Sequence, residues 1–357
     1  MQSSKTIRVA VIGVGSFGRN HARVYHQLQQ ESQKAASAPT ASLPPAPAPR
    51  IELAAIVDAN PERATEVARE FGAQPFTSIE QMLRATTIDA ASVAVPTIAH
   101  LEAASALMNA GVDVLIEKPI AASREQADEL ISIAKRTGCI AQVGQLERFN
   151  PAVRATMPFI TNPMFFEVHR LSIFTPRSLD VDVVLDLMIH DLDVVLSLVN
   201  SPVSEIRAVG LPVLTNKVDI ANVRVQFESG CVANFTASRV STERVRKLRF
   251  FQPHQYVSLD YSRRDVFMLT VKPIGAAASA SSEFTMPDIV PSKPEVVAEE
   301  PLLAELRSFL HAVDTRTAPL VPLEDGRRAL ALALDVLSAI EEHSRRANLD
   351  SIIHAKA

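Results

Sequence analysis

One apolar stretch of the chain carries polar side chains at regular intervals: DVVLDLMIHDLDVVLSLV, residues 182–199. Its many Val, Leu, Ile and Met residues predict a helix that is packed on most sides. At helical spacing, five polar side chains share one face: Asp182, Asp186, His190, Asp193 and Ser197. Asp191 lies off that face. A face in water is usually built from Glu, Lys, Gln and Arg, because Asp and His are weaker helix formers. One interpretation is therefore a face in water, and the other is a face that does chemistry.

A carboxylate one helical turn from a histidine is an arrangement suited to a general base. Asp186 and His190 can hydrogen-bond on a helix. The aspartate would then fix the imidazole tautomer and raise its basicity. The rival interpretation is a metal site, since Asp186, His190 and Asp193 could all ligate zinc. No cysteine or second histidine lies close in the sequence, so we expect no metal.

A glycine-rich turn, GVGSFG at residues 13–18, directly follows a strand-like run and opens a helix. In a dinucleotide fingerprint the three glycines permit the tight turn, the close approach of a pyrophosphate and the packing of the helix. The free N–H groups at the helix start would hold the phosphates. We therefore predict a cofactor cradle made of Gly13, Gly15, Ser16, Phe17 and Gly18.

Asp58 ends the second strand and supplies the acidic residue that such a fingerprint needs. It follows Gly18 by about 40 residues rather than about 20. The Pro- and Ala-rich segment 31–50 explains the difference, and we interpret it as an exposed loop, a tolerated insertion more than a partner-binding segment. A free carboxylate at this place accepts hydrogen bonds from the adenosine ribose and repels a 2′-phosphate, which favours NAD over NADP. The alternative is that Asp58 is only a turn residue.

The composition describes a folded protein that is not drawn to nucleic acid. Apolar residues make up 47% and charged residues 21% of the 357 residues, which excludes a disordered chain and permits two domains. The net charge of −4 favours neither nucleic acid nor an anionic membrane. Cys139 and Cys231 lack metal-ligand spacing and fit reduced thiols, and no apolar run reaches membrane-spanning length. We expect a cytoplasmic protein.

Strand-like and helix-like segments alternate through residues 1–148, with clear helix caps. This alternation predicts an α/β domain with a doubly wound parallel sheet of the Rossmann type. Residues 149–357 instead predict an α+β domain whose open sheet is mostly antiparallel, with the Asp/His helix inserted early in it. We expect residues 273–298 to be an irregular connection and two helices to end the chain.

Four segments together resemble the glucose–fructose oxidoreductase/inositol dehydrogenase/MocA family. They are GVGSFG, IEKP (116–119), GQLERFNP (144–151) and the pattern D-x-x-x-H-x-x-D at 186–193. They occur in the family's order over nearly the whole chain. Met188 stands where the family often has glycine. The resemblance implies the cofactor NAD, with cofactor-side residues that also include Pro96, His100, Glu117 and Gln145.

The resemblance further implies that a sugar hydroxyl is oxidised by hydride transfer to nicotinamide. Lys118 matches the catalytic lysine, while Asp186 and His190 match the acid–histidine pair. His190 would take the hydroxyl proton, and Lys118 would hydrogen-bond the hydroxyl and stabilise the developing alkoxide. Lys118 ends the fifth strand and would point into the cofactor crevice. The alternative is an ordinary surface lysine.

Within the family, residues 169–193 are most similar to bacterial dehydrogenases that oxidise the 3-hydroxyl of UDP-N-acetylglucosamine for lipid A. The resulting ketone is aminated there by a pyridoxal-phosphate enzyme, which implies a pathway aminotransferase as a partner. A diphosphate needs cations, and arginine binds phosphate oxygens in pairs. The predicted substrate-binding residues are Arg148, Asn150, Arg170 and Arg177, and a further cationic cluster comprises Arg239, Arg244, Arg246, Lys247 and Arg249. The alternative for these arginines is the protection of strand edges.

Two other functions stay open. One keeps the chemistry and changes the substrate to inositol or another free sugar. The other is a non-catalytic NAD(H)-sensing regulator on the same fold, against which the presence of Lys118, Asp186 and His190 together argues. The open sheet needs a cover on its second face, and the resemblance suggests that a partner subunit provides it in a homodimer or homotetramer.

Overall fold

The computed structural model describes residues 6–37, 49–175, 181–272 and 288–348. They form two compact units, of which the first is Met1–Leu146 with Glu300–Leu330 and the second is Glu147–Glu299 with Ala331–Ala357. Each unit has its own sheet and its own buried core. Within the described ranges, no helix combines the length and the apolar character that crossing a membrane requires.

The first unit is built on a six-stranded parallel sheet with the order β3-β2-β1-β4-β5-β6. The order reverses between β1 and β4, as in doubly wound dinucleotide-binding folds. This confirms the predicted Rossmann-type sheet. Its strands are β1 (Thr6–Ile12), β2 (Arg50–Val57), β3 (Gln74–Phe76), β4 (Ala90–Val93), β5 (Asp113–Glu117) and β6 (Ala141–Gly144).

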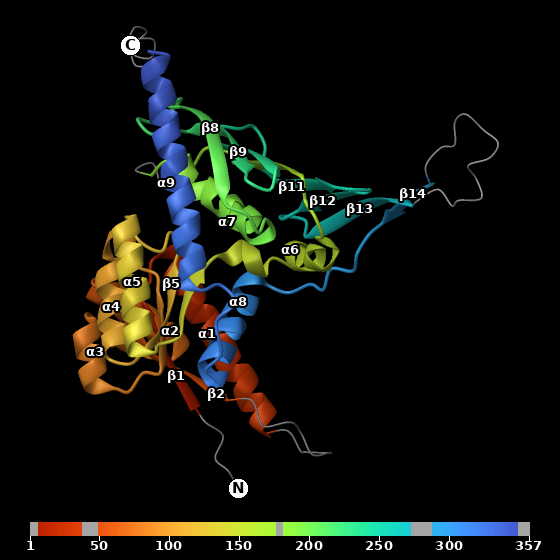
Figure 1. Ribbon diagram of the computed structural model, residues 1–357. Helices are drawn as coiled ribbons and strands as arrows, with labels where there is room; N and C mark the ends of the chain where they lie inside the picture. Colours follow the sequence, from red (N-terminus) through yellow and green to blue (C-terminus); the bar gives the residue numbers. More distant parts are fainter. Residues whose placement is uncertain (1–5, 38–48, 176–180, 273–287, 349–357) are drawn as a thin grey trace, which may run out of the picture. The chain divides into compact units, whose positions relative to one another are not determined.

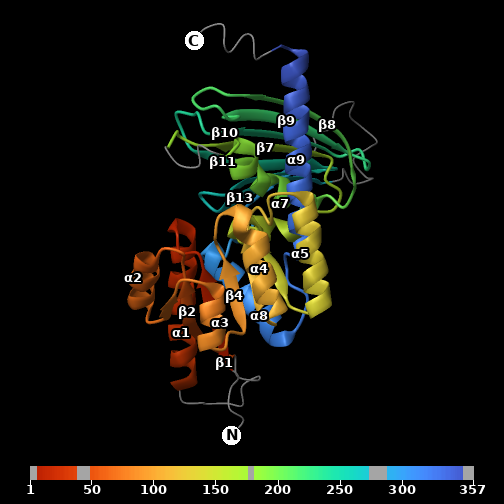
Figure 2. The same ribbon diagram turned by 90° about the vertical axis from the view of Figure 1, so that its left-hand side faces the viewer.

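Helices cover both faces of this sheet (Figure 1). One face carries α1 (Ser16–Ser37) and α8 (Pro301–Thr315), and the other carries α4 (His100–Asn109) and α5 (Arg124–Thr137). Figure 2 turns α3 (Ile79–Ala85), α4 and α5 toward the reader. Local sequence sets the helix ends. Asn60 caps α2 (Pro61–Phe71) with its side chain, and Gly72 ends that helix with a φ of 73°.

The helix α1 continues further into the Pro- and Ala-rich segment than predicted. Residues 31–37 are helical, whereas the composition indicated a loop from residue 31. Side chains near the helix end explain the difference, because Gln29 Oε1 accepts from Leu53 N at 2.7 Å and Ser32 Oγ accepts from Ile51 N at 3.2 Å. These bonds fix the end of α1 to β2. Residues 38–48, the rest of the insertion, lie outside the described residues.

The C-terminal region is shared between the units, which differs from the predicted boundary at residue 148. The helix α8 belongs to the first unit, because Leu306, Phe309 and Leu310 join the apolar core that α1 and the parallel strands form. The last helix, α9 (Leu323–Arg346), begins in the first unit and continues in the second. Helical periodicity predicts that a helix packs, but it does not specify the sheet on which it packs.

The second unit contains an eight-stranded sheet with the order β14-β13-β12-β11-β7-β10-β9-β8. Neighbouring strands are antiparallel except β7 and β10, so the predicted open, mostly antiparallel sheet is confirmed. One strand falls inside the segment expected to be irregular, β14, which pairs with β13. The strands are β7 (Phe165–Leu171), β8 (Val203–Leu211), β9 (Ile220–Phe227), β10 (Val232–Ser238), β11 (Val245–Gln252), β12 (Gln255–Asp260), β13 (Asp265–Lys272) and β14 (Asp288–Ser292).

In the described residues, one face of this second sheet is buried and the other is more exposed. Burial alternates residue by residue along β7, β9 and β10, as it does when one face of a sheet meets a core. The packed face carries α6 (Pro151–Thr156) and α7 (Ile189–Leu198) (Figure 1). The helix α9 also approaches closely, because a Cβ on Gly210 of β8 would lie 2.9 Å from Ile340.

The Asp/His helix lies between β7 and β8 as predicted, but its first turn is wider than an α-helix. Val184–Met188 forms a π-helical turn, and α7 begins only at Ile189. The predicted single polar face is therefore interrupted. Asp193 is 2% exposed and sits in the core, while Asp186 and His190 are partly exposed. This burial argues against a face that merely contacts water, and π turns are frequent at functional sites.

Candidate active site

The glycine-rich turn of the first unit has the geometry of a dinucleotide cradle. Gly13 adopts a φ of 82°, which favours glycine, and a Cβ there would lie 2.8 Å from the backbone oxygen of Ala94. A Cβ on Gly18 would lie 1.8 Å from the oxygen of Gly13, so α1 can start only where that side chain is absent. Around Gly15 nothing lies within 4 Å of such a Cβ. The backbone at Gly15 is thus accessible to a phosphate, and the cradle fits a pyrophosphate at the start of α1.

Asp58 reaches from the end of β2 to this turn. Its Oδ2 accepts a hydrogen bond from Val14 N at 2.9 Å, and its Oδ1 accepts from Asn60 N at 2.9 Å. Arg63 adds an ion pair at 3.4 Å. Asp58 is therefore not the free carboxylate that the sequence predicted. Two carboxylate oxygens offer about four acceptor positions, so capacity for ribose hydroxyls is left.

The carboxyl ends of β4 and β5 are joined by a buried histidine. His100 Nδ1 lies 2.9 Å from Pro119 O, and Nε2 lies 3.0 Å from Val95 O. Burial lowers the pKa of His100, although these two carbonyls work in the opposite direction. The predicted residue Pro96 lies exposed on the same loop, next to Val95. The structure thus places His100 as a brace between two loops at the cofactor edge.

Three further predicted residues follow β5 and β6 at this edge. Glu117 and Gln145 are buried, and Lys118 is partly exposed. By contrast, Ser16 and Phe17 are exposed at the start of α1. The cofactor-side residues predicted from sequence therefore gather at one edge of the first unit. Their roles toward NAD remain predictions.

In the second unit, Arg170 of β7 holds the Asp/His helix. Its Nε and Nη2 donate to the two carboxylate oxygens of Asp191 at 2.7 and 2.8 Å, and its Nη1 donates to Glu147 at 3.0 Å. The guanidinium also lies 5.1 Å from the centre of the Tyr261 ring. Burial alone would lower the pKa of Arg170, but the two carboxylates raise it. At 2% exposure this side chain is engaged inside the unit, which does not support the predicted substrate contact.

The other predicted substrate residues are also tied to the helix or to its surroundings. Arg148 lies 3.7 Å from Asp193, which is on α7. Asn150 caps α6 through Ala152 N at 3.0 Å and donates to Glu147 at 3.0 Å. Asn150 is 4% exposed, so its amide serves the fold. Arg177 lies outside the described residues.

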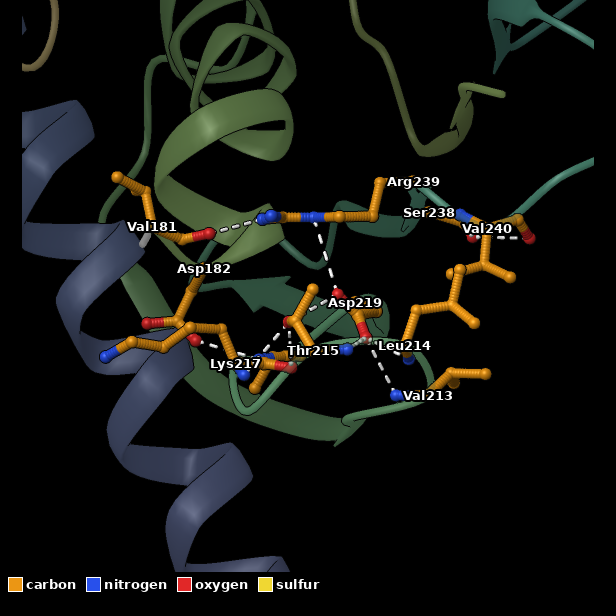
Figure 3. Close-up of polar contacts among 11 residues, drawn as sticks. Val181, Asp182, Val213, Leu214, Thr215, Lys217, Asp219, Ser238, Arg239 and Val240 are labelled. Atoms are coloured by element: carbon orange, nitrogen blue, oxygen red, sulfur yellow. Dashed lines mark hydrogen bonds and ion pairs between the residues drawn. The ribbon is translucent and has the colours of Figure 1, made fainter. Parts of the chain in front are cut away.

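A second set of polar contacts fixes the start of the Asp/His helix (Figure 3). Arg239, at the end of β10, donates to Val181 O and lies 3.7 Å from Asp219. Asp182 accepts from Val218 N at 2.9 Å. Burial disfavours ionisation of Asp219, but three backbone N–H donors, at Val213, Leu214 and Thr215, lower its pKa below the ordinary value. Arg239 is thereby assigned to this anchor rather than to a substrate phosphate.

The predicted pair Asp186 and His190 lies between these two anchors. Asp186 belongs to the π turn and His190 to the first turn of α7, and Met188 between them is fully buried. The hydrogen bond expected between Asp186 and His190 remains a prediction. In the described part of the chain, no group of three or more His, Cys, Asp or Glu residues is placed to hold a metal ion.

Sequence reasoning did not identify Glu147 and His21 as residues that bond to Arg170 and Glu117. His21 belongs to no quoted motif, and Glu147 lies in GQLERFNP without an assigned role, because the partners of both residues lie far away in sequence. Asp191 gave a usable signal. It was the one aspartate off the polar face, and it is buried, as is Asp193.

Both units match models of one protein family. Residues 7–145 match the oxidoreductase family with the NAD-binding Rossmann fold, and residues 153–252 match the GFO/IDH/MocA C-terminal domain. The chain is 36% identical over 341 residues to a UDP-N-acetylglucosamine 3-dehydrogenase of Acidithiobacillus ferrooxidans, a match that covers 95% of this chain and 99% of that relative. The chain belongs to the GFO/IDH/MocA family.

Further comparisons match solved structures and other dehydrogenases. A solved structure of the Acidithiobacillus ferrooxidans enzyme matches with a TM-score of 0.81 at 33% identity, covering 94% of this chain and 98% of that one. Levoglucosan dehydrogenase in complex with NADH has a TM-score of 0.77 at 18% identity, covering 95% and 98%. A scyllo-inositol 2-dehydrogenase (NAD(+)) of Bacillus subtilis is 27% identical over 66% of this chain and 68% of its own length. The chain is an NAD-dependent oxidoreductase. This finding argues against the alternative of a non-catalytic NAD(H)-sensing regulator.

The buried ion pair predicts a large effect of Arg170→Met on stability. The substitution would leave Asp191 and Glu147 buried without their cation, so we expect a loss of roughly 3–5 kcal/mol in the free energy of unfolding. The matched control is Arg249→Met on the adjacent strand, whose ion pair with Glu167 is at the surface and contributes about 0–1 kcal/mol. Urea unfolding followed by circular dichroism measures both. Equal losses in the two variants would contradict the assignment.

The contacts of Asp58 predict that it sets cofactor preference. We expect the wild type to prefer NAD to NADP, and Asp58→Ala to lower kcat/KM for NAD by roughly tenfold, the cost of a lost charged hydrogen bond. The control is Glu62→Ala, an exposed acid that follows Asp58 closely in the sequence. Steady-state rates with both cofactors check this. A wild type that prefers NADP would remove the assignment.

Proposed function

We propose that this enzyme oxidises the 3-hydroxyl of UDP-N-acetylglucosamine with NAD. The observation that carries the proposal is the similarity to a UDP-N-acetylglucosamine 3-dehydrogenase along 99% of that relative, which includes both units. The inositol dehydrogenase described above is less similar and matches over a shorter part of the chain. A free sugar or inositol is the second candidate, and it differs from the first in needing no diphosphate site.

The proposed chemistry removes a hydride from the sugar carbon and a proton from its hydroxyl, leaving a ketone. Bound NAD supplies the acceptor for the hydride. His190 takes the hydroxyl proton, and Asp186 orients the imidazole for this step. Lys118 hydrogen-bonds the same hydroxyl and stabilises negative charge as it develops on the oxygen. The 3-ketone is an electrophile that suits a subsequent amination, so we place an aminotransferase next in the pathway.

Arg246 is the cation of the second unit best suited to a phosphate. It lies opposite Arg170 on β11, on the sheet face that carries α7. Its Nε is buried, and the described residues offer that atom no hydrogen-bond acceptor. Burial and the neighbouring charge of Arg170 both lower the pKa of Arg246. An anion beside it would relieve that repulsion, and phosphate oxygens are good partners for a guanidinium.

The open face of the second sheet suits self-association. Phe165, Phe251 and Tyr256 lie on it in contact, with ring centres 5.6 and 5.1 Å apart, and Phe251 is 37% exposed. Clustered aromatic side chains on an open surface are typical of protein interfaces. We propose that a second copy of the chain covers this face in a homodimer or homotetramer.

The proposed mechanism predicts that Lys118→Met and His190→Asn each slow the chemical step by roughly a hundredfold while NAD affinity stays similar. Single-turnover NADH formation and NAD binding measure the two quantities separately. Lys135→Met, on the outer surface of α5, is the control. Near-normal turnover in either variant would remove that residue from the mechanism, and inactivation by chelators would instead support a metal.

The substrate is tested by NADH formation with UDP-N-acetylglucosamine, N-acetylglucosamine and myo-inositol. We expect turnover of the UDP-sugar and competitive inhibition by UDP. Arg246→Ala should raise KM by about tenfold with a smaller change in kcat, because phosphate contacts are the same in ground and transition states. Arg249→Ala, on the other sheet face, is the control. Robust oxidation of myo-inositol without any of the UDP-sugar would defeat the proposal.

If a second copy covers the open face, a charged residue introduced there should separate the subunits. Light scattering should give the mass of a dimer or tetramer for the wild type and of a smaller species for Phe251→Lys, since burying an unpaired charge is unfavourable. Arg224→Lys, also on an exposed position of this sheet, keeps its charge and serves as control. A wild type that is monomeric at micromolar concentration would refute the interface.

A further inference from the structure

A buried chain of hydrogen bonds in the first unit ends directly beside Lys118. It consists of Tyr25 and His21 of α1, Ser92 of β4 and Glu117 of β5. We propose that His21, acting through Glu117, is a positioning residue that fixes the end of β5 and thereby Lys118. This inference rests on the proposed function, because it affects catalysis only if Lys118 contacts the substrate.

The hydrogen bonds connect Tyr25 to Glu117 through Ser92 and His21. His21 Nε2 lies 2.9 Å from Glu117 Oε1, and an ionised carboxylate only accepts, so the ring donates there. On the other side of the ring, Nδ1 lies 3.0 Å from Ser92 Oγ. The Tyr25 hydroxyl is hydrogen-bonded to Ser92 Oγ at 2.9 Å. Burial raises the pKa of Tyr25, which keeps this hydroxyl protonated.

None of these groups can readily exchange its partner for water. His21, Tyr25 and Ser92 have no exposed surface, and Glu117 is 8% exposed. A buried carboxylate without a donor is strongly unfavourable. The Glu117 side chain is therefore held by its hydrogen bond to His21. This hydrogen bond joins α1 to the end of β5.

The strand β6 closes the other side of the Glu117 carboxylate. Gly144 is paired with Glu117 across the two strands, and a Cβ at Gly144 would lie 2.6 Å from Oε1 and 2.9 Å from Cδ. The second oxygen, Oε2, accepts from the backbone N of Lys118 at 3.3 Å. Glu117 thus has one position, between α1 and the bare backbone of β6, and in that position it holds the backbone of Lys118.

The same contacts connect Lys118 to the cofactor cradle. His21 lies on α1 one turn after Gly18, and the ring of Phe17 at the start of the helix packs edge-on against the His21 ring at 5.3 Å. Catalytic groups have to be held to within about 0.5 Å of their productive positions. His21 supplies this precision by joining the helix that would bind the pyrophosphate to the strand end that carries the lysine.

The kinetic test compares three substitutions in the full-length enzyme. His21→Leu removes the donor to Glu117, His21→Gln keeps an N–H at a similar distance, and Gly144→Ala pushes on the same carboxylate from β6. We expect His21→Leu to lower kcat by about tenfold or more, with KM and the Kd for NAD within about threefold, and His21→Gln to recover most of the loss. Gly144→Ala should act in the same direction, and its effect should not add to that of His21→Leu.

The control is His26→Leu, another histidine of α1, whose ring contacts Phe71 O at 3.0 Å, away from Glu117. It should leave kcat unchanged. An unchanged kcat in His21→Leu, a loss that His26→Leu reproduces, or an equal loss in His21→Gln would overturn the proposal.

A second readout does not depend on turnover. Acylation of lysines in the folded protein, quantified by mass spectrometry, should change in rate at Lys118 by about threefold or more in His21→Leu, because lysine reactivity follows its environment. The rate at Lys135 should stay constant. Unchanged Lys118 reactivity overturns the positioning role. If Lys118→Met retains full activity, the proposed function fails, and the labelling still decides whether His21 positions Lys118.

Discussion

A buried carboxylate needs donors, and this constraint organises both units. In the first unit Glu117 is held by His21, which joins α1 to β5. In the second, Asp191 is held by Arg170 and thereby joins the Asp/His helix to β7. Because an unpaired buried charge is so unfavourable, each pair fixes the distance between elements far apart in sequence. Asp219 follows the same rule with backbone N–H donors.

One carboxylate of each pair is the sequence neighbour of a residue proposed to do chemistry. Glu117 precedes Lys118, and Asp191 follows His190. A long lysine or a histidine on a partly exposed surface would otherwise sample many rotamers, at a cost in entropy for every productive encounter. Buried neighbours with fixed positions restrict the backbone from which these side chains extend. The π turn before α7 adds a local departure from regular helix at the same place.

Two arginines on one sheet face show how the fold gives the same residue type different surroundings. Arg170 and Arg246 are cross-strand neighbours. Arg170 is enclosed by Asp191 and Glu147, so its charge is used inside the unit. Arg246 is partly buried with a like charge beside it, and it is the residue proposed to bind a substrate phosphate. Both are arginines on strands in the sequence, and only the neighbours that the fold supplies distinguish them.

The sequence by itself determined what depends on neighbours along the chain. Alternating segments with caps specified the parallel sheet, the three glycines specified the turn at Gly13, and strand ends placed Asp58 and Lys118 at one edge. Helical spacing and the family motif also predicted the acid–histidine pair, which stays a prediction. Tertiary structure decided the rest, because side-chain partners, helix assignment to a sheet and the end of α1 depend on contacts between distant residues. Arg170, predicted to bind substrate, therefore lies bonded to Asp191 of α7, and α8 belongs to the first unit.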